Sequence, residues 1–586
     1  MKNLKIAKIQ EKLKKNNIDA LIINRTDEFL NEYISPDAER LFWVTNFSGS
    51  AGRAIINQNT SSLFVDGRYT FQAKEQIDDT VISLLHWNDF FKELSENFKK
   101  NKCVALDPML HSIEEVSKII ELADQNKTKL DFTLPNFIDA LWHDKPKRQY
   151  SIIFDHPINY AGIDALDKVN KFVEALKDNN LDSYFLSSLD SIAWLLNIRA
   201  DDILHTPLAF SYLFISVENK PVLYLSIEKL DIDLKKRLSH FLILKPIEEI
   251  EYIFKSCTKN LKIGFDFKNT SYFFYHLALN YNLIPFNLQN PCLISKATKN
   301  QIELEGSRNA HLRDGVSITR FLYWLKNHKN VDEENEISVA NKLLSFRQSN
   351  ELFHSISFET ISAIGKNAAL PHYRADKNNP VLLKKNSIYL SDSGGQYYDG
   401  TTDITRTIIL GKPNKEQIDR FTRVLKGHIN LSTHTFQIGT KGTDIDYLAR
   451  ESLKEINCDY DHGTGHGIGS FLSVHEAPQR ISKKSMFPSV ELLPGMILSN
   501  EPGYYKEGEY GIRIENIIVV KEDIKNQLKF ENISWAPIDR ELIDSAMLNK
   551  EELNWINDYH LKVFEKISKF LTQEEKNWLQ KVTKPL

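Results

Sequence analysis

Residues 462–469 read His-Gly-Thr-Gly-His-Gly-Ile-Gly, and this octet decides what kind of fold can carry the two histidines. A glycine in a helix interior costs about 1 kcal/mol relative to alanine. The glycines therefore argue against a metal-binding helix and predict closely packed backbone instead. We expect His462 and His466 to project from a loop or a strand.

Short apolar segments that end at glycines or turns flank the octet. They predict strands at Ile388–Leu390, Thr405–Ile409, Met496–Ser499 and Ile512–Glu515. A long helix is predicted from Asn300, with apolar residues at helical spacing: Ile318, Phe321, Leu322 and Leu325. Residues 294–586 are therefore predicted to form an α+β domain.

Acidic residues stand in or beside the turns of this domain. A hairpin between Asp392 and Asp403 would bring both carboxylates to one edge, although an aspartate in a turn is more often structural. Glu501 and Glu515 each lie at a strand, where an unpaired buried carboxylate would be expensive. Together with His466, these four carboxylates form a ligand set for two divalent metal ions.

The first half of the chain contains one α/β pattern twice. Asn16-Asn17-Ile18-Asp19 is matched by Asn179-Asn180-Leu181-Asp182, and a predicted strand follows each. Ile192–Leu196 then stands where Leu41–Thr45 stood. Two tandem copies of one α/β unit are the simplest account, although so short a match could arise by chance.

Three domains are predicted, because 586 residues exceed the size at which a single hydrophobic core stops growing. Trp142–Arg148 is polar, contains a proline and ends an apolar stretch, so we place a boundary near residue 158. Residues 1–158 and 159–293 are expected to be α/β domains, and residues 294–586 the α+β domain.

Composition and charge limit the partners and the compartment. The chain has 42% apolar and 26% charged residues, as soluble globular proteins do, and its net charge of -4 gives no reason to expect nucleic acid or a membrane as partner. No stretch approaches the roughly 18 apolar residues of a membrane span, and the Lys-rich N-terminus lacks the apolar region of a signal peptide. The four cysteines are widely spaced, which predicts free thiols and a cytoplasmic protein.

The order Asp, Asp eleven residues on, His, Glu, and Glu fourteen residues on resembles the metal-dependent pita-bread peptidases of family M24B. The motifs His-Gly-Thr-Gly-His, Glu-Pro-Gly-Tyr-Tyr and Gly-Ile-Arg-Ile-Glu-Asn are similar to those of the long, three-domain Xaa-Pro aminopeptidases. Further similarity covers nearly the whole chain, at residues 47–52, 66–69, 192–203 and 555–560. The resemblance implies two tandem creatinase-like α/β domains followed by a pita-bread catalytic domain with a C-terminal extension.

The resemblance also implies how the metal centre is built. Its two divalent ions would be held by Asp392, Asp403, His466, Glu501 and Glu515. Mn²⁺ suits a site that is rich in oxygen and has one imidazole, and Zn²⁺ or Co²⁺ would also fit. Two such ions would share a water, lower its pKa and present hydroxide to the scissile carbonyl. Glu501 would accept the water's proton and pass it to the leaving proline nitrogen.

Other residues receive roles from the same resemblance. His372 and His475 would donate hydrogen bonds to the substrate carbonyl and the developing oxyanion. His462 would line the pocket for the proline at the second substrate position. Arg513 is expected to orient Glu515 or a neighbouring carboxylate.

Two further residues are candidates for substrate contacts. Tyr505 is expected to touch the substrate directly, and Arg68 either reaches it from the first domain or is a structural arginine in a salt bridge. Two departures from the family pattern stand out. His205-Thr206-Pro207 lacks the usual asparagine before proline, and Pro371 directly precedes His372.

The resemblance implies a cytoplasmic, homodimeric Xaa-Pro aminopeptidase acting on peptides with proline in second position. Because a bond to proline has no N–H, such an enzyme must recognise the pyrrolidine ring. A prolidase shares the five ligands but normally has one N-terminal domain, and a methionine aminopeptidase carries little beyond the catalytic domain. A non-enzymatic binding module of this fold would lack the ligands.

Overall fold

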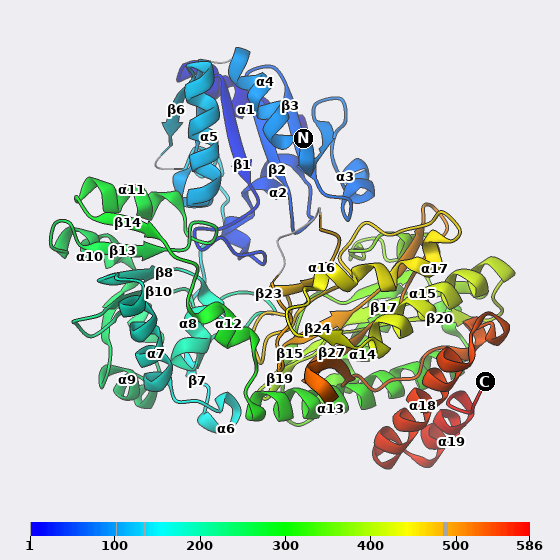
Figure 1. The fold of residues 1–586 in the computed structure, drawn as a ribbon. Coiled ribbons are helices and arrows are strands. Elements are labelled where there is room, and N and C mark those ends of the chain that lie inside the picture. The colour runs from blue at the N-terminus through cyan, green and yellow to red at the C-terminus, as the bar shows by residue number, and fades with distance from the viewer. Residues whose placement is uncertain (1, 101, 134–135, 485–489) are drawn as a thin grey trace. The chain divides into compact units, whose positions relative to one another are not determined.

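The computed structural model describes residues 2–100, 102–133, 136–484 and 490–586, which form two compact units (Figure 1). Unit 1 comprises Met1–Pro157 and Ile163–Cys292, and unit 2 comprises Ile158–Gly162 and Leu293–Leu586. The units do not separate residues 1–158 from 159–293, so that division stays a prediction. Within the described ranges, no helix combines the length and the apolar character that crossing a membrane requires.

A mixed six-stranded sheet organises the first part of unit 1, in the order β4-β3-β2-β1-β5-β6. Its strands are β1 Ala20–Asn24, β2 Arg53–Asn57, β3 Ser61–Val65, β4 Ser83–His86, β5 Cys103–Leu106 and β6 Lys129–Phe132. The helices are α1 Lys2–Lys15, α2 Arg40–Thr45, α3 Thr70–Gln76, α4 Phe90–Lys100 and α5 Ile113–Asn126. The apolar face of α1 is buried in the core of this sheet through Ile6, Ile9 and Leu13.

A second sheet in unit 1 has the matching order β12-β11-β10-β8-β13-β14. Its strands are β8 Ser183–Leu186, β10 Tyr212–Ser216, β11 Val222–Leu225, β12 Ile243–Pro246, β13 Lys262–Phe265 and β14 Ile284–Asn287. The helices are α7 Ala165–Asp178, α8 Leu189–Leu196, α9 Ile232–Ser239, α10 Ile250–Ser256 and α11 Tyr272–Asn280. In both sheets the strand that comes first in sequence pairs antiparallel on one side and parallel on the other. The shared topology confirms two tandem copies of one α/β unit.

The two copies meet through equivalent helix starts. Tyr272, at the start of α11, donates from its backbone N to the carbonyl oxygen of His111 at 2.9 Å. Ile113, at the start of α5, donates in the same way to the carbonyl oxygen of Thr270 at 3.0 Å. Because each copy donates to the other at corresponding positions, the contact is approximately two-fold.

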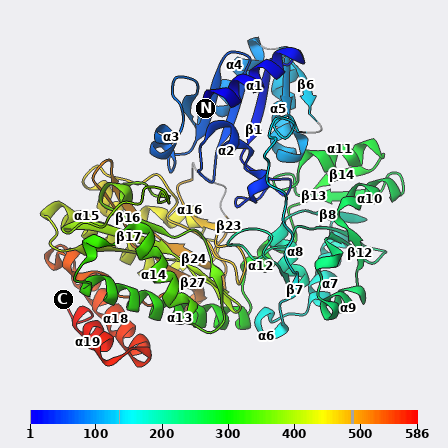
Figure 2. The ribbon, with the colours of Figure 1, turned by 180° about the vertical axis from the view of Figure 1, so that it is seen from behind.

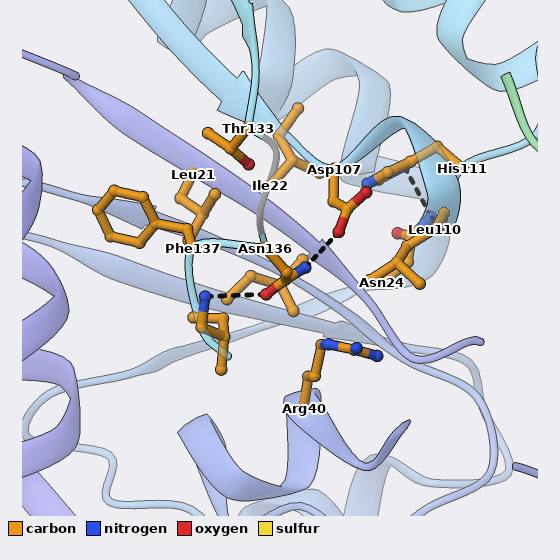
Figure 3. A pocket seen from close by; sticks show the side chains of 12 residues that line it. Leu21, Ile22, Asn24, Arg40, Asp107, Leu110, His111, Thr133, Asn136 and Phe137 are labelled. Atoms are coloured by element: carbon orange, nitrogen blue, oxygen red, sulfur yellow. Dashed lines mark hydrogen bonds between the residues drawn. The ribbon is translucent and has the colours of Figure 1, made fainter. Parts of the chain in front are cut away.

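Polar side chains line a pocket at the ends of β1 and β5 in the first copy (Figure 3). Asn136 Nδ2 donates to Asp107 Oδ2 at 2.6 Å, and Asn24 Nδ2 lies 2.9 Å from His111 Nδ1. Burial raises the pKa of Asp107. This end of the sheet is therefore held by hydrogen bonds as well as by apolar packing.

Unit 2 combines antiparallel sheets with long helices. The main sheets have the orders β16-β17-β20 and β21-β28-β27-β24-β22-β23, and β15-β18-β19 and β25-β26 are smaller. The strands nearest the candidate site are β16 Ile361–Ile364, β17 Ser387–Ser393, β20 Ile404–Leu410, β22 Gly465–Gly467, β23 Glu476–Ile481, β24 Ile497–Asn500, β25 Gly503–Lys506, β26 Tyr510–Arg513 and β27 Asn516–Glu522. The others are β15 Phe353–Ile356, β18 Gly395–Tyr397, β19 Gly400–Thr401, β21 Phe436–Gln437 and β28 Gln527–Asn532.

Five helices account for most of the helical structure of unit 2. They are α13 Gln301–Asn327, α14 Glu336–Gln348, α15 Lys415–Thr433, α18 Lys550–Ile567 and α19 Gln573–Val582. The view from behind in Figure 2 shows α14 beside β16 and β17, and α18 and α19 are drawn in red. The predicted long helix from Asn300 is confirmed as α13, with Asn300 as its N-cap in a capping box with Glu303.

The segment α6 (Ile158–Ala161) belongs to unit 2 although it lies between the two α/β copies in sequence. Asn300 Nδ2 donates to the carbonyl oxygen of Ala161 at 2.9 Å, which ties α6 to the start of α13. Residues 158–162 therefore group with unit 2, and the domain boundaries near residues 158 and 293 stay a prediction.

The predicted hairpin between the two aspartates is present. Strand β17 pairs antiparallel with β20, and Asp392 lies opposite Thr405. The predicted strand Ile512–Glu515 is observed as β26, which ends at Arg513. Glu515 therefore lies between two strands, where its backbone N donates to the carbonyl oxygen of Thr405 at 3.3 Å.

Candidate metal centre

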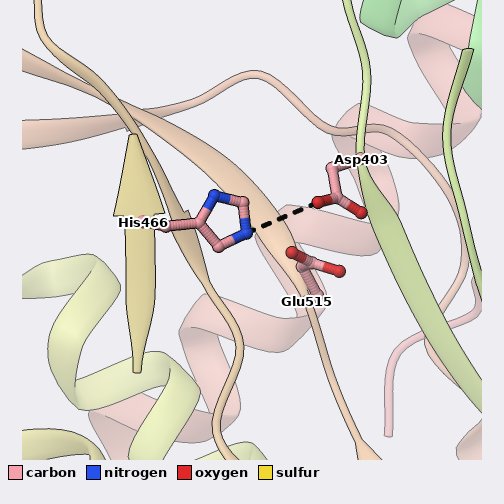
Figure 4. A group of neighbouring side chains, drawn as sticks. All are labelled: Asp403, His466 and Glu515. Carbon is pink, nitrogen blue, oxygen red and sulfur yellow. Dashed lines mark ion pairs between the residues drawn. The ribbon is translucent and has the colours of Figure 1, made fainter. Parts of the chain in front are cut away.

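Candidate ligands from separate strands meet inside unit 2 (Figure 4). Asp403 directly precedes β20, His466 lies in β22, and Glu515 lies between β26 and β27. Each of these three residues offers one atom that could bind a metal, and the three atoms lie within 4.8 Å of one another. His466 Nε2 is 3.6 Å from Asp403 Oδ2 and 3.6 Å from Glu501 Oε1. Four of the five predicted ligands are thus in direct proximity.

His466 presents one ring nitrogen to this cluster. Its Nδ1 lies 3.0 Å from the carbonyl oxygen of Gly467, which can only accept a hydrogen bond. A proton on Nδ1 satisfies this carbonyl oxygen and leaves the lone pair of Nε2 for a metal ion. A histidine oriented by its other nitrogen in this way is prepared to bind a metal ion.

Asp392 completes the cluster from within β17. Its Oδ2 accepts a hydrogen bond from Arg513 Nη2 at 2.6 Å. Its Oδ1 is buried and has no hydrogen-bond partner among the described residues, and the same is true of Asp403 Oδ1. Because buried polar atoms are nearly always paired, two unpaired carboxylate oxygens in one cluster point to cations as the missing partners.

Burial is the main reason why the pKa values of three of these carboxyl groups are raised in the metal-free protein. It raises the pKa of Asp403 and of Glu515 well above the ordinary value, and neighbouring carboxylates, Asp392 among them, raise it further. Burial also raises the pKa of Glu501 to about 7, although Arg513 opposes this increase. Two divalent cations would remove the repulsion, and oxygen ligands with one imidazole are donors that such ions accept. The residues present fit a dinuclear metal centre.

The metal-free protein is expected to lose stability as the pH rises from 4.5 to about 7. The ordinary pKa of 4.5 holds for Glu501 in the unfolded chain, whereas its folded pKa is about 7. Between these values the folded state binds more protons, so raising the pH favours unfolding. Bound divalent ions would replace those protons, so added Mn²⁺ is expected to raise the melting temperature more at pH 7.5 than at pH 5.5. Calorimetry of stripped and Mn²⁺-supplied protein tests this, and an equal increase at both pH values would contradict it.

Two histidines lie beside the cluster. The rings of His475 and His466 meet edge to face, with centroids 4.4 Å apart. His372 follows Pro371, whose carbonyl oxygen accepts a hydrogen bond from Arg513 Nη2 at 3.2 Å. Since the same nitrogen contacts a ligand carboxylate, the loop that carries His372 adjoins the centre. Pro371 makes this contact with its carbonyl, which proline retains although it lacks an N–H.

His462, Tyr505 and Arg513 form one hydrogen-bonded chain. Arg513 Nη1 donates to the Tyr505 hydroxyl at 2.7 Å, and that hydroxyl lies 2.8 Å from His462 Nε2. An arginine can only donate, so the Tyr505 hydroxyl accepts from Arg513 while it shares a second hydrogen bond with His462 Nε2. Arg513 Nε also donates to Thr405 Oγ1 at 3.3 Å, and Thr405 Oγ1 donates to Glu515 Oε2 at 2.8 Å. Arg513 thus contacts Asp392 directly and reaches Glu515 through a threonine.

Arg68 lies in unit 1, where it forms a bidentate salt bridge. Its Nε and Nη2 atoms donate to the two carboxylate oxygens of Asp66 at 3.0 and 2.7 Å. The guanidinium also lies over the ring of Tyr69, 5.2 Å from its centroid. These contacts fit the structural alternative, and its role toward substrate stays a prediction.

The sequence does not single out Glu336, yet this buried acid holds the loop of His372. Its Oε2 accepts a hydrogen bond from the hydroxyl of Tyr373 at 2.7 Å. Its Oε1 accepts from the backbone N of Ile364 at 2.8 Å and from Asn367 Nδ2 at 3.0 Å. Because Tyr373 follows His372 directly, Glu336 limits the positions available to that histidine. No motif marks Glu336, since its partners are distant in sequence.

A second buried acid supports His475. Glu476 follows it directly, and its carboxylate forms ion pairs with Lys296 in α12 (Cys292–Ala297), at 3.0 Å, and with Lys299. The three side chains are at most 1% exposed. Lys299 Nζ also donates to the carbonyl oxygen of Lys296 at 2.8 Å. The start of β23 is therefore anchored to the segment that leads into α13.

Comparison with family models covers almost the whole chain. Residues 305–522 match metallopeptidase family M24, and residues 526–586 match the C-terminal region of peptidase M24. Residues 5–134 and 144–303 each match a creatinase/prolidase N-terminal domain. These matches confirm the predicted fold class, with two creatinase-like domains before the pita-bread domain.

Named relatives match over their full length. A probable Xaa-Pro aminopeptidase P of Talaromyces marneffei is 36% identical over 99% of this chain and 92% of its own. One of Laccaria bicolor is 35% identical over 99% of this chain and 93% of its own. An X-prolyl aminopeptidase of Caenorhabditis elegans, described as a cytosolic enzyme with a di-nuclear active site, has a TM-score of 0.94 and 30% identity over 100% of both chains. A Xaa-Pro dipeptidase from Bacillus anthracis has 22% identity and a TM-score of 0.51, and it covers 64% of this chain and 99% of its own.

Proposed function

The chain belongs to metallopeptidase family M24, and on this premise we propose that it is a metal-dependent Xaa-Pro aminopeptidase. It hydrolyses the N-terminal peptide bond of peptides with proline in second position. The observation that carries this conclusion is the full-length match to Xaa-Pro aminopeptidases, with both N-terminal domains included. A prolidase with one such domain would leave the second unexplained.

The metal ions would be held by the carboxylates and the imidazole of the cluster: Asp392, Asp403, His466, Glu501 and Glu515. Two bound divalent ions lower the pKa of water toward neutrality and polarise the scissile carbonyl. We infer Mn²⁺ as the preferred ion, because oxygen ligands dominate, with Zn²⁺ and Co²⁺ as alternatives.

Glu501 serves as the general base. Its side chain is 17% exposed at the edge of the cluster, so a proton on it can still reach a substrate atom. Ser499 Oγ donates to Glu501 Oε1 at 3.3 Å and limits the rotation of the carboxylate. Glu501 accepts a proton from the attacking water and delivers it to the proline nitrogen as that group leaves.

His475 and His372 serve as hydrogen-bond donors to the substrate. His475 stands edge-on to His466, so a carbonyl oxygen bound at the centre would lie within its reach. The loop that carries His372 is held through Tyr373 and Glu336. A donor aimed at an oxygen that becomes negative contributes about 2.7–4 kcal/mol at the transition state.

His462 and Tyr505 form a wall for the proline ring. Their ring centroids are 5.4 Å apart, and the ring of Tyr460 lies 4.7 Å from that of His462 on another side. Arg513 orients Asp392 and Tyr505 at once. An aromatic wall of this kind binds a pyrrolidine ring by apolar contact. For Arg68, a substrate contact stays a candidate role beside the structural one in its salt bridge to Asp66.

We further propose a cytoplasmic homodimer. The Caenorhabditis elegans relative is described as cytosolic, and the free cysteines of this chain are compatible with a reducing compartment. Peptides are the expected partners, and the net charge of -4 gives no attraction to nucleic acid or to an anionic membrane.

Hydrolysis of Arg-Pro-Pro and of Ala-Pro by purified protein, first metal-stripped and then supplied with Mn²⁺, tests the proposed activity. We expect Mn²⁺ to restore cleavage of the tripeptide, with little cleavage of the dipeptide. The reverse preference would indicate a prolidase. No cleavage of either peptide with any divalent metal, in a folded protein, would point to a binding role instead.

A further inference from the structure

Arg406 is a buried cation directly behind the metal centre, with 3% exposure. Its Nη1 donates to the carbonyl oxygens of Thr405 at 2.9 Å and Glu515 at 2.7 Å. Its other nitrogens donate to Asn516 Oδ1 (2.8 Å), to the carbonyl oxygens of Ala536 (2.9 Å) and Pro537 (3.2 Å), and to the Tyr559 hydroxyl (2.7 Å). Among the described residues, no carboxylate accepts a hydrogen bond from Arg406. The guanidinium is thus held by neutral oxygen atoms, one of which is the backbone carbonyl oxygen of Glu515.

Glu515 is held from two sides by neighbouring residues of β20. Thr405 donates to its carboxylate oxygen Oε2 at 2.8 Å. Arg406, which points to the opposite face of the strand, binds its backbone carbonyl oxygen. The orientation of this predicted ligand therefore depends on where the guanidinium of Arg406 is fixed.

Helix α18, in the C-terminal region, fixes that guanidinium. The hydroxyl of Tyr559 accepts a hydrogen bond from Arg406 and donates to the carbonyl oxygen of Ala536 at 2.8 Å. The ring of Tyr559 stacks on that of Trp555 in the same helix, with centroids 5.3 Å apart and planes 3° from parallel. The helix and this stacking therefore fix the orientation of both aromatic rings relative to each other.

A chain of contacts connects Trp555 with the segment beside Glu501, the second glutamate of the centre. The ring of Trp555 meets that of His428 edge to face at 5.8 Å, and His428 Nδ1 lies 3.1 Å from the carbonyl oxygen of Asn500. Asn500 Nδ2 donates back to the carbonyl oxygen of His428 at 2.9 Å. Asn500 directly precedes Glu501, so α18 supports the backbone beside both glutamate ligands.

We propose that Arg406 and Tyr559 are positioning residues through which helix α18 sets the metal affinity of the active centre. The inference rests on the proposed function only for the assignment of Glu515 and Glu501 as ligands. Contacts that orient a ligand from behind typically change metal affinity by 10–100-fold when they are removed.

The test is calorimetric titration of full-length, metal-stripped Tyr559→Phe with Mn²⁺, with electron paramagnetic resonance of free Mn²⁺ as an independent readout. We expect the dissociation constant of at least one Mn²⁺ ion to rise about tenfold or more. The control is Tyr184→Phe in unit 1, which loses a hydrogen bond of 3.1 Å from a buried tyrosine to the carbonyl oxygen of Leu288. This control should bind Mn²⁺ as the unmodified protein does.

Arg406→Lys provides a second variant, since it keeps the charge but cannot reach all the acceptors of the guanidinium. It should weaken Mn²⁺ binding at least as much as Tyr559→Phe. Dissociation constants within twofold of the unmodified protein in both variants would overturn the inference, even if the metal-free variants melt at lower temperature. Unmodified protein that binds Mn²⁺ tightly but cleaves no Xaa-Pro peptide would refute the proposed function and leave this inference intact.

Discussion

The Glu501→Gln variant is expected to fold and to lose peptide hydrolysis, with kcat lower by about 10²–10⁴-fold. Glutamine has the shape of glutamate but cannot accept the proton of the attacking water. It is also a weaker metal ligand, and Glu501 Oε1 lies 3.6 Å from His466 Nε2 in the centre. The measurement is the kcat for Arg-Pro-Pro at saturating Mn²⁺, with the Mn²⁺ content of the protein determined in parallel.

Glu507→Gln is the matched control, because Glu507 is exposed in the hairpin between β25 and β26. It should retain the kcat of the unmodified protein. If Glu501→Gln keeps its Mn²⁺ and also keeps kcat within tenfold, Glu501 is not the base. If it loses one Mn²⁺ together with its activity, Glu501 acts first as a ligand.

The Glu476→Gln variant is expected to lower the free energy of unfolding of unit 2 by about 3–5 kcal/mol. The ammonium groups of Lys296 and Lys299 are buried against this carboxylate, and the neutral amide would remove their shared counter-charge. Since His475 precedes Glu476, kcat for Arg-Pro-Pro should fall as well. Differential scanning calorimetry of the full-length variant and of the unmodified protein measures the change.

Asp523→Asn is the control for this prediction. Asp523 pairs with Lys529 at 2.8 Å, and the lysine side chain is 49% exposed. A surface pair of this kind contributes about 0–1 kcal/mol. Equal melting temperatures for Glu476→Gln and Asp523→Asn would show that the buried cluster does not stabilise unit 2.

Local sequence patterns predicted the elements near the site well. The glycines around His466 predicted a strand or loop, and His466 lies in β22. The Asp392 to Asp403 spacing predicted a hairpin, and β17 pairs with β20. Glu515 was less accurately predicted, because the strand ends at Arg513. Hydrogen bonding between distant segments decides where a strand ends, so local apolar patterns leave that position open.

The sequence did not identify residues whose partners are far away along the chain. Glu336 and Glu476 are buried acids, and Arg406 is a buried cation. Each of them contacts residues that are far away in sequence. A carboxylate beside His475 could be seen in the sequence, but the two lysines that bind it could not. The contact between Tyr559 and Arg406 joins the C-terminal region to β20 and likewise requires the folded chain.

The sequence by itself determined the kind of centre this protein can have, because ligand chemistry depends on residue type: four carboxylates and one imidazole bind divalent metals wherever they meet. Only the tertiary structure decided that they meet, since they lie in or directly beside strands that are far apart in sequence and that pairing brings together. It also decided their protonation and orientation, because burial raises the pKa of Glu501 to about 7. The supports of the centre, from Arg513 to Arg406, exist only in three dimensions, because a hydrogen bond depends on distance in space and not on distance along the chain.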